Sequence, residues 1–183
     1  MMNILEDLEY EIEHFDESSF PLAYLITFRT FGTWLHGDAR TSVSRDGRNR
    51  YGTQRIKPRP QLEAAMKRNR THQAIFLNLR MRKAVLQAVR GFCKRRGYKL
   101  LAVNVRSNHV HIVIAAQAQP ERVADSIKAV STKIVREKGL IKANAKVWSR
   151  GRSRRYLWKP QHVTSAVEYV LYNQGDAEFE RSE

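Results

Sequence analysis

One short segment, Asn108–Ala115 with the sequence NHVHIVIA, constrains the fold more than any other part of the chain. Side chains alternate between the two faces of a β-strand, so His109 and His111 share one face, and Val110, Ile112 and Ile114 share the other. The apolar face needs helices to cover it, whereas the histidine face is expected to stay open. The segment therefore predicts a strand of an antiparallel sheet with helices on one face.

The segments around this strand predict the rest of the sheet. Residues 98–105 form a second strand, joined to it by a tight turn at Arg106–Ser107, and residues 24–30 are rich in aromatic and β-branched residues. Apolar stripes at helical spacing predict helices over residues 61–68, 80–96, 120–138 and 163–174. Residues 147–158 predict another hairpin or a bent strand. The order is that of an α+β, ferredoxin-like split βαβ fold with the histidine strand at the centre of the sheet.

Charge is distributed unevenly along the chain. Residues 1–20 hold seven acids and no Lys or Arg, whereas residues 21–175 hold 32 basic and 7 acidic residues, a net charge of +25. The positive charges of this region repel one another unless a polyanion binds to it. Nucleic acid is the expected polyanion. The expected phosphate contacts are Arg82, Lys83, Arg90, Lys94, Arg95, Arg96, Arg150, Arg152, Arg154 and Arg155. Some of these side chains are expected to belong only to a solvated charged surface.

The same pattern predicts the domain organisation. Residues 1–20 form an acidic arm, residues 21–175 a single domain with a basic, loop-rich insertion at 31–79, and residues 176–183 an acidic tail. No apolar run approaches the ~18 residues of a membrane-spanning helix. The lone Cys93 falls in a helical pattern and is expected to be a buried, unreactive residue. These features favour a cytoplasmic protein without membrane contact.

The pair His109 and His111 is a candidate metal site. The two imidazoles are about 7 Å apart along the strand, and two neutral imidazoles on one face can bind a divalent ion. An isolated His-x-His is more often a pair of partly exposed strand histidines without a metal. Other features of the sequence are needed to distinguish a metal site from two metal-free histidines.

The last predicted helix carries a tyrosine that can serve the same site. Val163, Val167, Val170 and Leu171 form its apolar stripe, and Tyr169 and Asn173 share the flank next to it. A phenol can attack phosphorus, and an amide oxygen one turn later can complete a metal site. The alternative is that Tyr169 merely edges the core, which is the commoner use of tyrosine.

Two other functions fit parts of the sequence. A non-catalytic module on a similar sheet would bind RNA or single-stranded DNA by stacking bases on strand aromatics, but residues 108–115 contain no aromatic ring beyond the two imidazoles. A phosphoesterase of one known type needs two His-x-Ser/Thr motifs. The sequence has one, His162-Val163-Thr164, but the segment that begins at His109 does not fit the pattern. His162 is expected instead to begin the tyrosine helix.

The two motifs together resemble a known family. NHVHIVI resembles the His-hydrophobic-His motif of HUH endonucleases, and EYVLYNQG resembles the tyrosine helix of single-tyrosine transposases, above all the REP-associated tyrosine transposases and related insertion-sequence transposases. The resemblance covers residues 24–175 and includes FRTFGTWLHGD after the first strand. The insertion at 31–79 and the acidic arm depart from the family's compact pattern.

The resemblance implies a function and a set of site residues. Tyr169 would be the nucleophile, and His109 and His111 would bind Mg²⁺ or Mn²⁺ with a third ligand from the tyrosine helix, either Asn173 or Gln174. The protein would cleave and rejoin single-stranded DNA, with or without a hairpin, through a 5′-phosphotyrosine. Since excision needs two DNA ends, a homodimer is expected. A domesticated, non-catalytic descendant would carry the same motifs.

Overall fold

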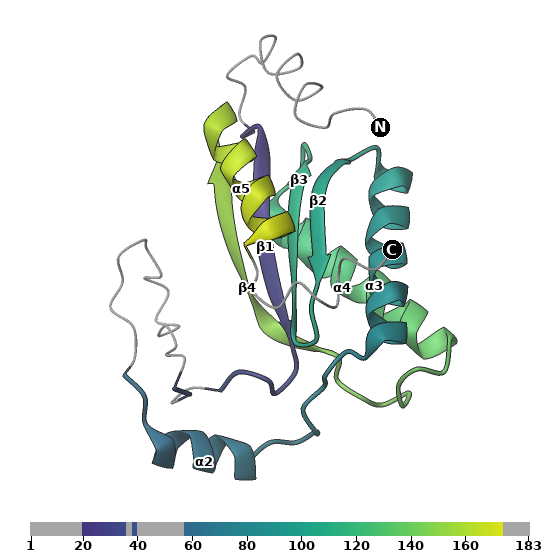
Figure 1. Ribbon diagram of the computed structural model, residues 1–183. Helices are drawn as coiled ribbons and strands as arrows, with labels where there is room; N and C mark the ends of the chain where they lie inside the picture. The colour runs from purple at the N-terminus through teal and green to yellow at the C-terminus, as the bar shows by residue number, and fades with distance from the viewer. Residues whose placement is uncertain (1–19, 36–37, 40–56, 174–183) are drawn as a thin grey trace.

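The computed structural model describes residues 20–35, 38–39 and 57–173. Eight elements lie in this part of the chain (Figure 1). They are β1 (Ala23–Thr30), α2 (Pro60–Arg68), α3 (Leu79–Arg96), β2 (Lys99–Val105), β3 (His109–Ala115), α4 (Pro120–Glu137), β4 (Trp148–Leu157) and α5 (Pro160–Tyr172). Residues 1–19 of the predicted acidic arm, residues 36–37 and 40–56 of the predicted insertion, and the predicted acidic tail lie outside the described residues.

The four strands form one antiparallel sheet in the order β2-β3-β1-β4. This is the strand order of a ferredoxin-like split βαβ fold, and β3 is a central strand, as that fold assignment predicts. The hairpin between β2 and β3 also lies where it was predicted. Residues 147–158, by contrast, are not a hairpin but the single edge strand β4, which pairs with β1.

Helices α3 and α4 cover the apolar face of the sheet. Val110, Ile112 and Ile114 of β3 are completely buried there, against a core that includes Val85 of α3 and Ile127 of α4. Asn78 caps the start of α3, because its Oδ1 accepts a hydrogen bond from the backbone N–H of Met81 at 3.0 Å. These two helices confirm the helical cover predicted for this face.

Helix α5 lies on the opposite face, the one that carries the histidines (Figure 1). Val163, Val167 and Val170 of α5 pack there in a second core with Val113 of β3 and Leu157 of β4. Leu171, predicted to belong to the same stripe, is instead 41% exposed in the last turn of the helix. The arrangement with helices on one face therefore holds for α3 and α4 but not for α5, and the histidine face is partly covered. On the histidine face, α5 packs against the apolar residues Val113, Ala23 and Leu101. Strand alternation alone does not show which helix covers such residues.

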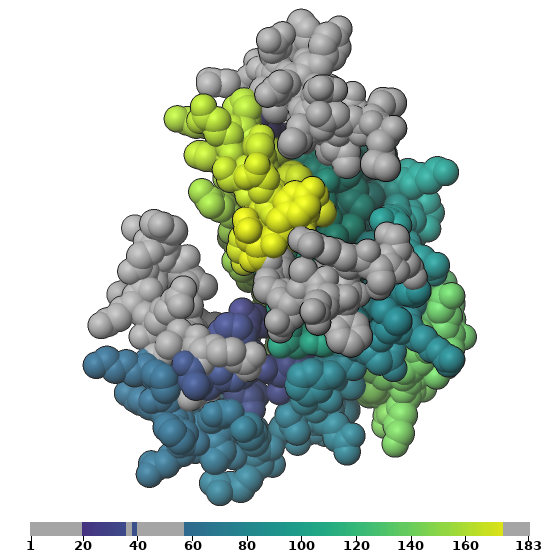
Figure 2. All heavy atoms as spheres, in the orientation of Figure 1, coloured from purple at the N-terminus to yellow at the C-terminus, as the bar shows by residue number. Residues whose placement is uncertain are grey.

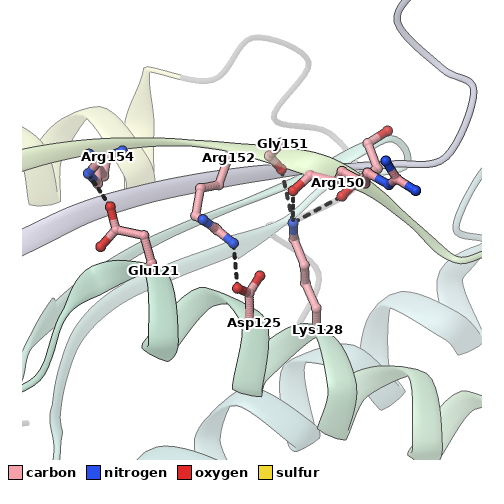
Figure 3. Close-up of polar contacts among 8 residues, drawn as sticks. Glu121, Asp125, Lys128, Arg150, Gly151, Arg152 and Arg154 are labelled. Carbon is pink, nitrogen blue, oxygen red and sulfur yellow. Dashed lines mark hydrogen bonds and ion pairs between the residues drawn. The ribbon is translucent and has the colours of Figure 1, made fainter. Parts of the chain in front are cut away.

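A polar network attaches the edge strand β4 to α4 (Figure 3). The buried Lys128 of α4 donates hydrogen bonds to the carbonyl oxygens of Ser149, Arg150 and Gly151 at 2.9–3.4 Å. Along the same side, Arg152 pairs with Asp125, and Arg154 pairs with Glu121 at 2.6 Å. The network satisfies a buried ammonium group and holds the irregular start of β4 against the helix.

Three further observations concern features noted in the sequence. Cys93 of α3 is buried, and this burial raises the pKa of its thiol to about 11, so the thiol stays protonated near neutral pH. Within the described residues, no helix is long and apolar enough to cross a membrane. His162 stands in the first turn of α5, as expected.

Candidate active site

The two imidazoles of β3 lie side by side on the α5 face of the sheet. Their ring centroids are 4.6 Å apart with an interplanar angle of 78°. In the sheet, His111 stands opposite Thr27 of β1 and His109 opposite Arg29. His111 is buried and His109 is half-buried. The pairing predicted from alternation therefore exists as a compact, partly enclosed group.

Each imidazole is held through its Nδ1 atom. His111 Nδ1 forms a hydrogen bond with Thr27 Oγ1 at 2.7 Å, and His109 Nδ1 donates to Asn108 Oδ1 at 2.6 Å. Histidines that bind metals are oriented in this way, because a bond at one ring nitrogen sets the tautomer and directs the other nitrogen to the ion. The arrangement fits a divalent ion bound through the two Nε2 atoms.

Tyr169 comes to this pair from α5. Its ring centroid lies 5.6 Å from that of His111, with an interplanar angle of 77°. Its side chain is 41% exposed, so the ring reaches the site while remaining accessible to a substrate. Tyr172 of the same helix is 69% exposed and makes no such ring contact with the histidines. Of the two tyrosines, Tyr169 is thus the one beside the imidazoles.

Asn104 of β2 fixes α5 in this position. Its Nδ2 donates a hydrogen bond of 2.9 Å to the carbonyl oxygen of Val170, the residue after Tyr169. Because α5 ends at Tyr172, this carbonyl belongs to the last turn and lacks a partner within the helix. Asn104 also stands directly opposite His111 in the sheet. One buried amide thereby connects the tyrosine helix to the histidine strand.

The third metal ligand remains a prediction. Asn173 is exposed and forms the C-cap of α5, one turn after Tyr169, while Gln174 lies outside the described residues. Within the part of the chain that the structure describes, no group of three or more His, Cys, Asp or Glu residues could hold a metal.

The predicted DNA-contacting cations fall into separate groups. Those of α3 lie on the helix that covers the far face, away from the histidines. These are Arg82, Lys83, Arg90, Lys94, Arg95 and Arg96. On β4, Arg152 and Arg154 point to α4, whereas Arg155 is exposed on the histidine side, opposite Leu25. Arg150 is exposed at the start of the strand.

Sequence reasoning missed three residues of this region, namely Thr27, Arg29 and Asn104. All three are polar residues on the histidine face of strands whose other face is apolar. Arg29 stands beside His109, and its guanidinium carbon lies 3.1 Å from the ring centroid of Trp34. The alternation that identified His109 and His111 also singles out these residues, once the neighbouring strands are known.

The sequence of residues 66–171 matches the family model described as IS200-like transposase. The chain belongs to this family. The matched range is more than half of the protein and includes His109, His111 and Tyr169. Transposition of DNA is therefore the process in which this protein family acts.

Solved structures that are similar to this chain include two transposases. One is a REP-associated tyrosine transposase bound to a REP hairpin, with 12% identity and a TM-score of 0.48 over 87% of this chain and 70% of the other. The second is a candidate transposase from Deinococcus radiodurans, with 13% identity and a TM-score of 0.43 over 87% and 95%. Among curated proteins, none matches the sequence significantly. The family assignment rests on the family model.

Proposed function

We propose that this transposase cleaves and rejoins single-stranded DNA through a covalent bond to Tyr169. The observation that supports this most strongly is the contact between Tyr169 and His111, which come from the last helix and a central strand. The core beneath α5 and the Asn104 bond hold the phenol beside two oriented imidazoles. A tyrosine that only packed at the margin of the core would not need to lie beside two oriented imidazoles.

The proposed reaction is a transesterification. The Tyr169 Oη atom attacks the phosphorus, the bond from phosphorus to the 3′ oxygen breaks, and the DNA is left with a 5′-phosphotyrosine and a free 3′-OH. The phenol loses its proton and the departing 3′ oxygen gains one. Because the phosphodiester is replaced by another phosphoester, rejoining by a 3′-OH needs no external energy source.

His109 and His111 would hold a divalent metal, Mg²⁺ or Mn²⁺, together with Asn173 or Gln174. When bound, such an ion neutralises and orients the negatively charged phosphate. Thr27 and Asn108 keep the imidazoles in the orientation that this binding requires. Arg155 and Arg29, on the same side of the sheet, would attract the DNA strand.

Single-stranded DNA is the proposed substrate, and a homodimer is the proposed active form. The net charge of +25 over residues 21–175 fits a polyanion, and the REP-associated transposase was solved with a DNA hairpin. Each chain contributes one Tyr169, so two chains are needed to handle two DNA ends at once.

A covalent-adduct assay tests the proposal. The protein is incubated with Mn²⁺ and a pool of random single-stranded oligonucleotides labelled at the 3′ end, since a 5′-phosphotyrosine retains the 3′ fragment. Tyr169→Phe should abolish the labelled protein band on a denaturing gel and leave DNA binding nearly unchanged. Tyr172→Phe is the matched control and should retain the band.

Two results would contradict the proposal. Loss of the band in Tyr172→Phe but not in Tyr169→Phe would show that the nucleophile is the other tyrosine. DNA binding without any adduct, in every metal tested, would identify the chain as a non-catalytic binding module.

A further inference from the structure

A pocket of about 450 Å³ lies beside the end of β1, between the loop at residues 31–35 and α2. Phe31 and Trp34 form aromatic walls on the loop side, and Leu62 and Met66 line it from α2. None of the residues of α2 is buried, so the apolar side of this helix still faces an open space. Figure 2 shows the residues after β1 lying against α2 in the lower part of the molecule.

The pocket also carries positive charge. Lys146 and Arg150 line it from the segment that leads into β4, and Arg70 lines it from the residues after α2. The Lys146 ammonium lies 4.8 Å from the ring centroid of Phe31. Among the residues that the structure describes, no Asp or Glu lines the pocket. Aromatic faces next to cations are the features that proteins use to bind unpaired nucleotides, because bases stack on the rings and phosphates pair with the cations.

Hydrogen bonds hold the aromatic loop in place. The Phe31 N–H donates to the Val147 carbonyl at 2.8 Å, and the Phe31 carbonyl accepts from the Ile75 N–H at 2.9 Å. Gly32 has a φ of 72°, and a Cβ there would lie 3.0 Å from Arg70 Cδ and 3.1 Å from Ala74 Cα. The loop requires a glycine at this point, and the walls of the pocket are built into the fold.

The pocket adjoins the candidate active site. Trp34 stacks with Arg29, which stands opposite His109 in the sheet. The Thr30 N–H and Thr30 Oγ1 both donate to the Asn108 carbonyl, at 2.9 and 3.1 Å, so the loop and the histidine strand are tied together. A strand whose phosphate lies at His109 can therefore place a neighbouring nucleotide in the pocket.

We propose that this pocket binds one unpaired nucleobase of the DNA strand next to the phosphate that is cleaved. The inference rests on the proposed function for its substrate, single-stranded DNA. The loop at 31–35, and Leu62 and Ala65 of α2, lie outside the residues 66–171 that match the family model. The pocket therefore joins residues outside that range to residues inside it, among them Met66 and Lys146.

Binding to two probes tests the pocket without any cleavage. The full chain carries Tyr169→Phe, and its affinity is measured for a short thymidine oligonucleotide and for a chain of the same length that lacks bases. Trp34→Ala should weaken binding of the thymidine oligonucleotide by roughly 5- to 150-fold, the loss expected for one stacked base. Binding of the base-free chain should stay unchanged, because it depends on phosphates alone.

Two further variants complete the test. Ala65→Trp narrows the pocket from α2 and leaves Arg29 and Trp34 themselves unaltered, and it should reproduce the loss even if Trp34→Ala disturbs the loop. Trp158→Ala removes an indole that is 53% exposed outside the pocket, and it should keep the preference for the thymidine probe.

Equal weakening of both probes in Trp34→Ala and Ala65→Trp would overturn the proposal, as would unchanged binding in both variants. An equal loss in Trp158→Ala would show that base contacts are spread over the surface, and would overturn it as well. Failure of the adduct assay would count against Tyr169 chemistry alone, because these affinities are measured in a chain that cannot form the adduct.

Discussion

The two faces of the sheet use the same strands for different purposes. On one face of β3, Val110, Ile112 and Ile114 are completely buried under α3 and α4. On the other face, His109 and His111 meet Thr27 and Tyr169 under a single helix. The packed apolar face holds β3, and with it the imidazoles, in position. The single helix over the other face leaves Tyr169 partly exposed, as a group that reacts with a substrate must be.

Strand β4 shows the same division in its arginines. Arg152 and Arg154 pair with the acids of α4 on the apolar side (Figure 3). Arg155 stands opposite Leu25, on the histidine side. The basic run RGRSRR looks uniform in the sequence, yet alternation divides it between a structural ion-pair network and the candidate DNA side.

The strongest test of this division is the loss of the imidazoles. His109→Ala and His111→Ala should each lower the rate of adduct formation by at least about 100-fold, because each removes a proposed metal ligand. A chelator should have the same effect on the unmutated protein. The rates are measured by gel, with Mn²⁺ titrated. Full activity in chelator, or in both variants, would exclude the metal site.

The next effect is expected on the other face of the same strand. Ile112→Ala should lower the free energy of unfolding by about 2–5 kcal/mol, because it leaves a cavity in the main core. At a temperature where the variant is still folded, its rate of adduct formation should remain close to that of the unmutated protein. Denaturant titration gives the stability. A specific loss of cleavage in the folded variant would mean that the two faces are not separable in this way.

A smaller effect is expected at Asn104, which connects the two regions. Asn104→Ala leaves the Val170 carbonyl without its donor and should cost about 1–3 kcal/mol of stability. If Asn104 positions Tyr169, kcat for adduct formation should fall while KM changes little. Val85→Ala, in the main core, is the matched control and should lose stability without the change in kcat. Equal kcat values in both variants would leave Asn104 with a purely structural role.

The smallest expected effect separates the arginines of β4. Arg155→Ala should reduce the slope of log affinity against log salt by about 0.7 for single-stranded DNA, the amount expected for one phosphate contact. Arg154→Ala should reduce it less, because Glu121 already neutralises that side chain. Affinities are measured over a range of salt concentrations. A larger reduction for Arg154 would place the DNA on the α4 side of the strand.

Much of this protein is determined by short-range sequence pattern. The alternation in NHVHIVI defines β3 and puts His109 and His111 on one face, and helical spacing defines α3 and α4 with Cys93 in the core. The spacing of Tyr169 from the stripe of α5 likewise predicts a side chain at the edge of that helix's packed side. These features depend only on which neighbours along the chain share a face, and the geometry of a strand or a helix decides that.

The pairing of the strands and the packing of α5 are known only from the tertiary structure. Only long-range pairing shows that residues 148–157 form one edge strand, that α5 covers the histidine face, and that Arg29 and Asn104 stand beside the imidazoles. The alternation of a strand states which of its residues share a face, but it does not state which strand lies next to it or what packs above. Those choices depend on the free energy of burying surfaces that are distant in the sequence.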